Sequence, residues 1–182
     1  MRKDKPARLI LENGVVFHGK SFGSDKSSSG EVVFNTAMVG YPESLTDPSY
    51  EGQILTITYP VIGNYGVPPN SMTNEVSDFF ESDRIHVKGL VVLDYSHDYS
   101  HWHAEQSLSD WLKKEDIPAI YDIDTRELTK LLREVGSMSG KIVIGDADEN
   151  EIDFYHPSKE NLVAKVSCQE IIEYKNGEKK VV

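Results

Sequence analysis

Residues 39–50 read Val-Gly-Tyr-Pro-Glu-Ser-Leu-Thr-Asp-Pro-Ser-Tyr, and the rest of the chain is organised around this stretch. Two apolar runs that predict β-strands flank it, Glu31–Met38 and Gln53–Tyr59. The glycine, the two prolines, the acids and the hydroxyl residues between them predict a tight, polar and ordered connection. Loops that are held by a rigid sheet often carry binding groups, so we expect functional residues here.

Further strands are predicted on both sides of this stretch. Arg8–Glu12 and Val15–Gly19 flank Asn13-Gly14, whose tolerance of positive φ angles suits a two-residue hairpin turn. His86–Asp94 is apolar at its centre, which predicts a strand that is covered on both faces. Two shorter strands are predicted at 118–121 and 139–145.

Helical patterns begin in the second half of the chain. Ser107–Glu115 places its apolar residues on one side, and Asp78–Ser82 predicts a shorter helix. Asp124-Thr125-Arg126-Glu127 has the spacing of a capping box and starts a helix that ends at Gly136. Because strands dominate the first half and alternate with helices later, we expect a layered, mixed α/β domain with an antiparallel part and a part made by crossovers.

Composition limits the class of protein. The chain has 182 residues, which is enough for one ordinary domain with a core of its own. Its formal net charge of −11 would repel a phosphate backbone, so nucleic acid is not an expected partner. No apolar run approaches the ~18 residues of a membrane-spanning helix. Cys168 is the single cysteine, which fits a reducing compartment, and we predict a cytoplasmic location.

The composition changes after Gly145. Residues 146–153 contain five acids in eight positions, which predicts a linker and places the end of the domain at about residue 145. Asn176-Gly177 suggests a hairpin, and the chain stops at Val181-Val182, as if at the start of a strand. We therefore expect residues 1–145 to form a domain and residues 146–182 to lead into another domain that this sequence does not contain.

Ser49 is the leading candidate for a binding residue. The Asp47-Pro48-Ser49 turn is expected to point a hydroxyl and a neighbouring N–H outward, which suits a carboxylate, an amide or an oxyanion. The alternative is that Asp47 and Ser49 only satisfy backbone groups of the turn. A serine nucleophile is not indicated, because Gly-x-Ser-x-Gly does not occur.

Other side chains leave weaker alternatives open. His97, His101 and His103 have a spacing that a metal-dependent hydrolase could use, although solvated loop histidines explain them equally simply. Gly63–Gly66 matches neither glycine-rich phosphate-binding pattern. Cys168 has no neighbouring residue that would lower its pKa. From these residues alone, the interpretation ends at a mixed α/β domain with one distinctive loop.

Four blocks carry a more specific resemblance: Gly30–Thr36, residues 39–50, Tyr59–Gly66 and Asp124–Lys130. Together they closely resemble the N-terminal domain of the small subunit of carbamoyl-phosphate synthetase, in the eukaryotic fused form, from about Ala7 to Ser167. The resemblance implies a three-layer β/β/α fold of the swivelling type. It also implies an enzyme, a ligase that makes carbamoyl phosphate from glutamine, bicarbonate and ATP for the pyrimidine or arginine pathway.

The resemblance assigns roles to two residues of the turn. Ser49 is implied to bind glutamine, and Asp47 is implied to lie at a domain or subunit interface. The implied partners are a following class I glutaminase domain, with a Cys-His-Glu triad, and the large synthetase subunit. No catalytic residue, metal or cofactor is expected in this chain, because ATP and Mg²⁺ belong to the synthetase part. The chain alone should be inactive; the alternative is a stand-alone binding or regulatory module with the same fold.

Overall fold

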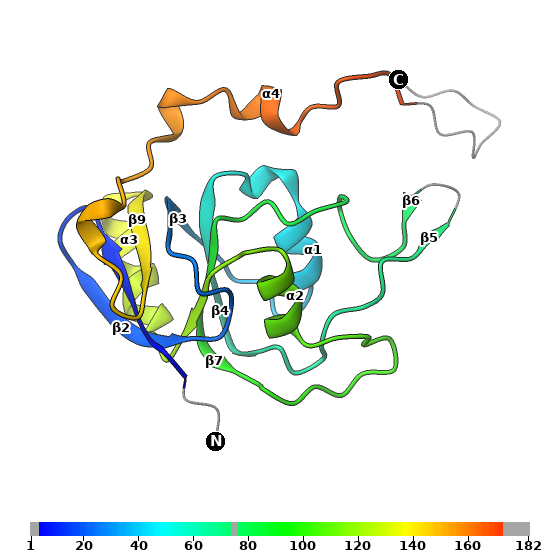
Figure 1. The fold of residues 1–182 in the computed structure, drawn as a ribbon, viewed down its shortest axis with the longest axis horizontal. Helices are drawn as coiled ribbons and strands as arrows, with labels where there is room; N and C mark the ends of the chain where they lie inside the picture. The colour runs from blue at the N-terminus through cyan, green and yellow to red at the C-terminus, as the bar shows by residue number, and fades with distance from the viewer. Residues whose placement is uncertain (1–3, 74–75, 173–182) are drawn as a thin grey trace.

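The structure is a computed structural model that describes residues 4–73 and 76–172. Within these residues, one mixed sheet of seven strands closes into a barrel in the order β1-β2-β8-β7-β4-β3-β9 (Figure 1). These strands are β1 Pro6–Leu11, β2 Val16–Ser21, β3 Ser28–Asn35, β4 Gln53–Ile62, β7 Gly89–Tyr95, β8 Ala119–Tyr121 and β9 Met138–Ile144. β3, β4, β7 and β8 pair in parallel, whereas β9, β1 and β2 pair antiparallel. The predicted mixed α/β class is therefore confirmed.

The first hairpin forms as predicted, but its turn differs. Leu11 N donates to Val15 O over 2.9 Å, so the loop contains the three residues from Glu12 to Gly14. Only Gly14 in this loop has a positive φ, 87°. Asn13 instead uses its side chain to accept a hydrogen bond from Val15 N at 3.1 Å. The predicted two-residue turn was wrong, because a three-residue loop needs only one left-handed residue and glycine supplies it.

Two apolar clusters lie on the opposite faces of β4, β7 and β8. Leu90 and Val92 of β7 belong to the outer cluster, whereas Val91 belongs to the inner one, and all three are fully buried. The outer cluster also contains residues of helices α1 (Tyr41–Thr46) and α2 (Leu108–Lys114). The prediction that this strand is covered on both faces is thus confirmed, since successive side chains of a strand alternate between the faces.

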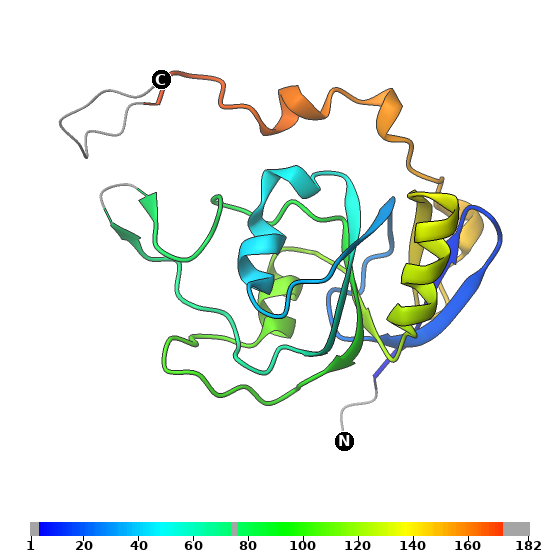
Figure 2. The same cartoon turned by 180° about the vertical axis from the view of Figure 1, so that it is seen from behind.

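Helix α3, Thr125–Val135, forms where the capping box predicted it. Asp124 Oδ1 accepts from Glu127 N at 2.8 Å, and Gly136 N donates to Leu132 O at 2.9 Å at the other end. Its apolar face buries Leu128 and Leu132 in the inner cluster. Figure 2, seen from behind, shows α3 and the cyan helix α1 on opposite sides of the barrel strands.

Residues 39–50 are more regular than predicted. They were expected to be a polar connection, but they fold into α1 and the 3₁₀ helix η1, Pro48–Tyr50. The pattern was misleading because α1 is short and contains a proline, which is tolerated in a first helical turn. Leu45, on the packed face of α1, is completely buried, so tertiary packing stabilises a helix that local propensity alone would not.

The predicted helix at Asp78–Ser82 does not form. Phe80 N donates to Ser77 Oγ at 3.0 Å, and Glu81 N donates to Thr46 Oγ1 at 3.1 Å. These backbone donors therefore find partners outside a helical turn. Two short strands, β5 Met72–Thr73 and β6 Val76–Ser77, precede this segment and were not predicted.

Residues 146–172 run along the outside of the barrel as an extended tail, with η2 Glu149–Glu151, η3 Pro157–Lys159 and α4 Leu162–Val166 (Figure 1). The tail is attached at several points: Arg8 pairs with Glu149 at 2.9 Å, and Ser139 Oγ donates to Tyr155 O. The predicted Asn176-Gly177 hairpin and the strand start at Val181-Val182 lie outside the described residues. None of the helices in the described ranges has the length and apolarity needed to span a membrane.

Candidate functional site

The Asp47-Pro48-Ser49 turn connects α1 to β4. Asp47 Oδ1 accepts from Ser49 N at 2.8 Å, and Asp47 O accepts from Tyr50 N at 3.0 Å. The expectation of an outward-pointing N–H was therefore wrong, because both backbone donors close the turn. Asp47 behaves as the simpler alternative predicted, whereas Ser49 is exposed and its hydroxyl contacts no hydrogen-bond partner among the described residues. The exposed polar group of the turn is the Ser49 hydroxyl.

A distant tyrosine caps the start of α1. The helix has no side-chain cap of its own, and Gly40 before it has a φ of 86°. The Tyr65 hydroxyl accepts from Gly40 N at 2.9 Å and from Tyr41 N at 3.1 Å. The Tyr41 ring stacks on the Tyr65 ring with centroids 4.2 Å apart, and its hydroxyl donates to Gly66 O at 2.6 Å. Gly63–Gly66 is thus a support for the functional loop.

The environment keeps Tyr65 neutral. Burial raises the pKa of its hydroxyl, and the two backbone N–H donors at Tyr41 and Gly40 offset only part of that rise. A neutral phenol retains its own proton and still accepts both hydrogen bonds. The cap is therefore maintained throughout the ordinary range of pH.

Tyr65→Phe is expected to lower the free energy of unfolding by about 1–2 kcal/mol, because two half-buried N–H groups lose their acceptor. Urea unfolding followed by circular dichroism measures this change. Tyr59→Phe is the matched control, since Tyr59 is 37% exposed and its hydroxyl has no hydrogen bond among the described residues. Equal unfolding midpoints for the two variants would contradict the capping role.

The end of α1 is anchored by the segment that follows β6. Ser82 Oγ donates to Thr46 O at 2.6 Å, and Thr46 Oγ1 accepts from Glu81 N at 3.1 Å. His86 N donates to Leu45 O at 2.9 Å. These bonds satisfy the last carbonyl groups of a helix that lacks further turns of its own. The backbone just before Asp47 is consequently held in place.

A buried carboxylate follows the turn immediately. The Glu51 side chain is only 10% exposed, and its Oε2 lies 2.9 Å from His86 Nδ1, whose side chain is 4% exposed. Arg84 and Lys88 approach the same carboxylate at 3.7 and 3.9 Å. This cluster was not predicted from the sequence. Its signal was the spacing of Arg84, His86 and Lys88 at every second position, which puts them on one side of an extended segment.

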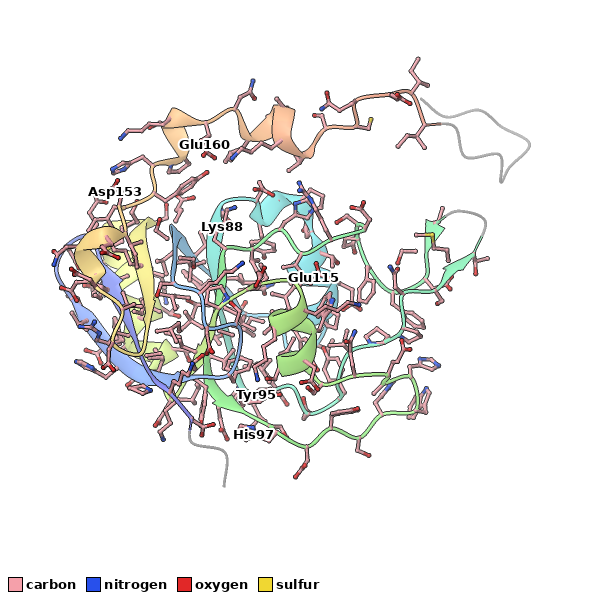
Figure 3. The ribbon with its side chains drawn as sticks, viewed as in Figure 1. Lys88, Tyr95, His97, Glu115, Asp153 and Glu160 are labelled. Atoms are coloured by element: carbon pink, nitrogen blue, oxygen red, sulfur yellow. The ribbon has the colours of Figure 1, made fainter. Side chains whose placement is uncertain are left out.

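The tail passes beside this cluster. A cavity of about 620 Å³ is lined by Pro48, Ser82 and His86 from the body and by residues 165–168 from the tail. Arg84 Nη2 donates to Lys165 O across it at 3.4 Å. Figure 3 shows Lys88 on the body beneath the tail segment that carries Glu160. Cys168 is exposed on the tail.

The three histidines of the metal hypothesis do not converge. His97 lies edge-on to Tyr95 with ring centroids 4.8 Å apart, whereas His101 stacks on Trp102 at 4.2 Å. His101 and His103 instead line a groove of about 420 Å³ beside Val39 and Tyr65. Across residues 4–73 and 76–172, no three histidine, cysteine or acidic side chains gather as metal ligands would. The arrangement gives a metal-dependent hydrolase no support.

The sequence of this domain matches a known family. A sequence model described as "Carbamoyl-phosphate synthase small chain, CPSase domain" matches residues 9–142, which is most of the chain and includes all or part of each barrel strand. The chain belongs to this family. The matched range contains the Ser49 turn, the Tyr65 cap and the Glu51 cluster of this carbamoyl-phosphate synthase small-chain domain.

Relatives of this small-chain domain are found in several larger proteins. The chain is 51% identical over 177 residues to multifunctional protein pyr1-3 of Dictyostelium discoideum, covering 96% of the chain and 8% of that protein. It is 50% identical over 165 residues to the carbamoyl phosphate synthase arginine-specific small chain of Saccharomyces cerevisiae, covering 90% and 40%. It is 49% identical over 177 residues to human carbamoyl-phosphate synthase [ammonia], mitochondrial, covering 96% and 12%. The chain thus spans less than half of each of these relatives.

Proposed function

We propose that the chain is the N-terminal domain of the glutaminase part of a glutamine-hydrolysing carbamoyl-phosphate synthase. The observation that carries the proposal is the exposed Ser49 hydroxyl, held by a closed turn inside a domain of this family. In this role the domain docks the glutaminase onto the synthetase and contributes to glutamine binding. The product, carbamoyl phosphate, would serve pyrimidine or arginine synthesis, and we place the enzyme in the cytoplasm.

Ser49 and Asp47 have distinct proposed roles. The Ser49 hydroxyl donates to, or accepts from, the polar groups of bound glutamine, and the Asp47 side chain lies at the interface with the synthetase while closing the turn. Residues 1–145 form the docking domain, and residues 146–182 lead to a class I glutaminase domain. We also propose a three-layer β/β/α arrangement of the swivelling type, which the packing of α1 and α2 on one face of the barrel supports.

The chain supplies no reacting group of its own under this proposal. Glutamine hydrolysis needs a thiolate nucleophile with an adjacent base, and no Gly-x-Cys-x-Gly sequence is present. Cys168 is exposed on the tail and belongs to the connection between domains. ATP and Mg²⁺ act on the synthetase part. We therefore expect the 182-residue chain alone to leave glutamine unchanged.

A second candidate function is favoured by one comparison. Human carbamoyl-phosphate synthase [ammonia], mitochondrial, is nearly as similar to the chain as the pyr1-3 protein is, at 49% against 51% identity. An enzyme that uses ammonia would retain this domain for docking alone, and Ser49 would have no ligand. A stand-alone binding module is not favoured, because each relative described above is a longer protein.

Ser49→Ala in the full-length enzyme tests the proposal. The KM for glutamine is expected to rise about 10- to 100-fold, which corresponds to a lost hydrogen bond to a charged group of the ligand. The rate of synthesis with ammonia is expected to remain within about twofold, because the synthetase part is untouched. Both rates are measured as carbamoyl phosphate formed, at saturating bicarbonate and ATP.

Ser100→Ala is the matched control, since Ser100 is an exposed serine in another loop. An equal fall with glutamine and with ammonia would mean that Ser49 acts through folding. An unchanged response to glutamine, or a wild-type enzyme that ignores glutamine, would favour the ammonia-using candidate.

A further inference from the structure

Three side chains form a hydrogen-bonded chain beneath the Ser49 turn. Glu51 Oε2 lies 2.9 Å from His86 Nδ1, and His86 Nε2 lies 3.0 Å from Ser82 Oγ. Ser82 Oγ in turn donates to Thr46 O at 2.6 Å. The order carboxylate, imidazole and hydroxyl is that of a hydrolytic triad. The direction of the hydrogen bond between His86 and Ser82 therefore decides whether these three residues can be catalytic.

The contacts of Ser82 show that this direction is reversed. Its oxygen approaches two carbonyl oxygens, Thr46 O at 2.6 Å and Arg84 O at 3.2 Å, and neither can donate a hydrogen. The single hydroxyl proton must point to a carbonyl, so His86 Nε2 has to be the donor toward Ser82. An imidazole nitrogen that carries a proton cannot act as the base for a serine nucleophile. The geometry thus excludes catalysis by Ser82 and gives the three hydrogen-bonded side chains a structural role.

These hydrogen-bonded side chains connect the two ends of the segment that carries Ser49. Thr46 is the last residue of α1 before Asp47, and Glu51 follows η1 directly. The path from Thr46 O through Ser82 and His86 to Glu51 therefore closes residues 46–51 into a ring of backbone and side chains. Ser49 lies on the exposed part of this ring. A displacement of either end would move its hydroxyl.

The surroundings strengthen this connection. His86 and Glu51 are almost fully buried, and hydrogen bonds are stronger where water is excluded. Arg84 at 3.7 Å and Lys88 at 3.9 Å balance the Glu51 carboxylate from the same segment. Arg84 also donates to Lys165 O, so the cluster contacts the tail as well as the turn.

We propose that Glu51, His86 and Ser82 are positioning residues that hold the Ser49 hydroxyl where glutamine is bound. We call them the turn clamp. The inference rests on the proposed function for its consequence in catalysis, but the clamping itself is a property of this chain. It assigns a role to two buried residues, Glu51 and His86, that lie outside the Asp47-Pro48-Ser49 turn.

The kinetic test uses Ser82→Ala and His86→Gln in the full-length enzyme. Each variant is expected to raise the KM for glutamine at least fivefold while the rate with ammonia stays within twofold. His97→Gln is the matched control, since His97 is an exposed histidine outside the clamp. An unchanged KM for glutamine in both variants, with Ser49→Ala impaired, would overturn the proposal.

A double-variant cycle separates positioning from a general effect. If the clamp acts through Ser49, then Ser49→Ala with Ser82→Ala has the same KM for glutamine as Ser49→Ala alone. If the KM of the double variant instead rose by the product of the two single-variant increases, Ser82 would act independently of Ser49, and the proposal would be overturned. Ser82→Ala is the milder substitution because Ser82 is half-buried, so it keeps the test decisive if His86→Gln does not fold.

Hydrogen exchange in the 182-residue chain tests the clamp without reference to activity. Ser82→Ala is expected to raise the exchange rates of the Ser49 and Tyr50 amides at least tenfold, while that of Leu9, in the barrel, is unchanged. If Ser49→Ala leaves the KM for glutamine unaltered, the proposed function fails, but faster exchange would still support the clamp. Unchanged exchange at both turn amides would overturn the clamp, whatever the role of Ser49.

Discussion

Leu45→Ala is expected to lower the free energy of unfolding by about 3 kcal/mol. Leu45 is completely buried in the outer cluster, where α1 packs against β4 and β7. Shortening the side chain removes apolar contacts and leaves a cavity that a short helix cannot close. Because most domains are stable by only about 5–15 kcal/mol, a loss of this size is a large part of the total. Urea unfolding followed by tryptophan fluorescence measures it.

The effect of Leu45→Ala should extend to the functional turn. α1 ends one residue before Asp47, so a loosened helix is expected to raise the KM for glutamine in the full-length enzyme as well. Val39→Ala is the control, since Val39 precedes α1 and is 76% exposed; its stability should change by no more than about 0.5 kcal/mol. A Leu45→Ala protein as stable as the Val39→Ala protein would contradict the packing of α1 on the barrel.

Gly19→Ala is expected to lower the free energy of unfolding by about 2–3 kcal/mol. A Cβ atom at this position would lie 2.3 Å from Tyr121 O and 2.8 Å from Ile123 Cδ1. The first of these atoms belongs to the backbone, so β2 and β8 would have to separate. Their pairing consists of two residue pairs only, Lys20 with Tyr121 and Ser21 with Ile120, so few strand-to-strand contacts resist the separation. Thermal unfolding measures the loss.

His18→Ala is the matched control for Gly19→Ala, because His18 is the preceding residue of β2 and is exposed. Its midpoint should remain close to that of the unmodified chain. If Gly19→Ala unfolded at the same temperature as His18→Ala, β2 could not approach β8 as closely as a closed barrel requires.

Strands and helices whose sequence signals lie within a few residues could be predicted from the local pattern. The apolar centre of β7, the Asp124 cap of α3 and the apolar side of α2 were all predicted correctly, because apolar runs, periodicity and capping depend on neighbours along the chain. The four sequence blocks also indicated the family, and the match over residues 9–142 confirmed it. The role of Ser49 remains a prediction.

The hydrogen bonds that hold the Ser49 turn in place could be found only from the tertiary structure. The Tyr65 cap joins residues 24 positions apart, and the Glu51–His86 pair joins residues 35 positions apart. α1 was missed for the same reason, since a six-residue helix forms only when distant groups cap and cover it. The sequence by itself determined the barrel strands and the helices α2 and α3, through short-range propensity and periodicity. Only the closed barrel determined which polar groups meet around Ser49, because hydrogen bonds between distant segments depend on the fold that brings them together.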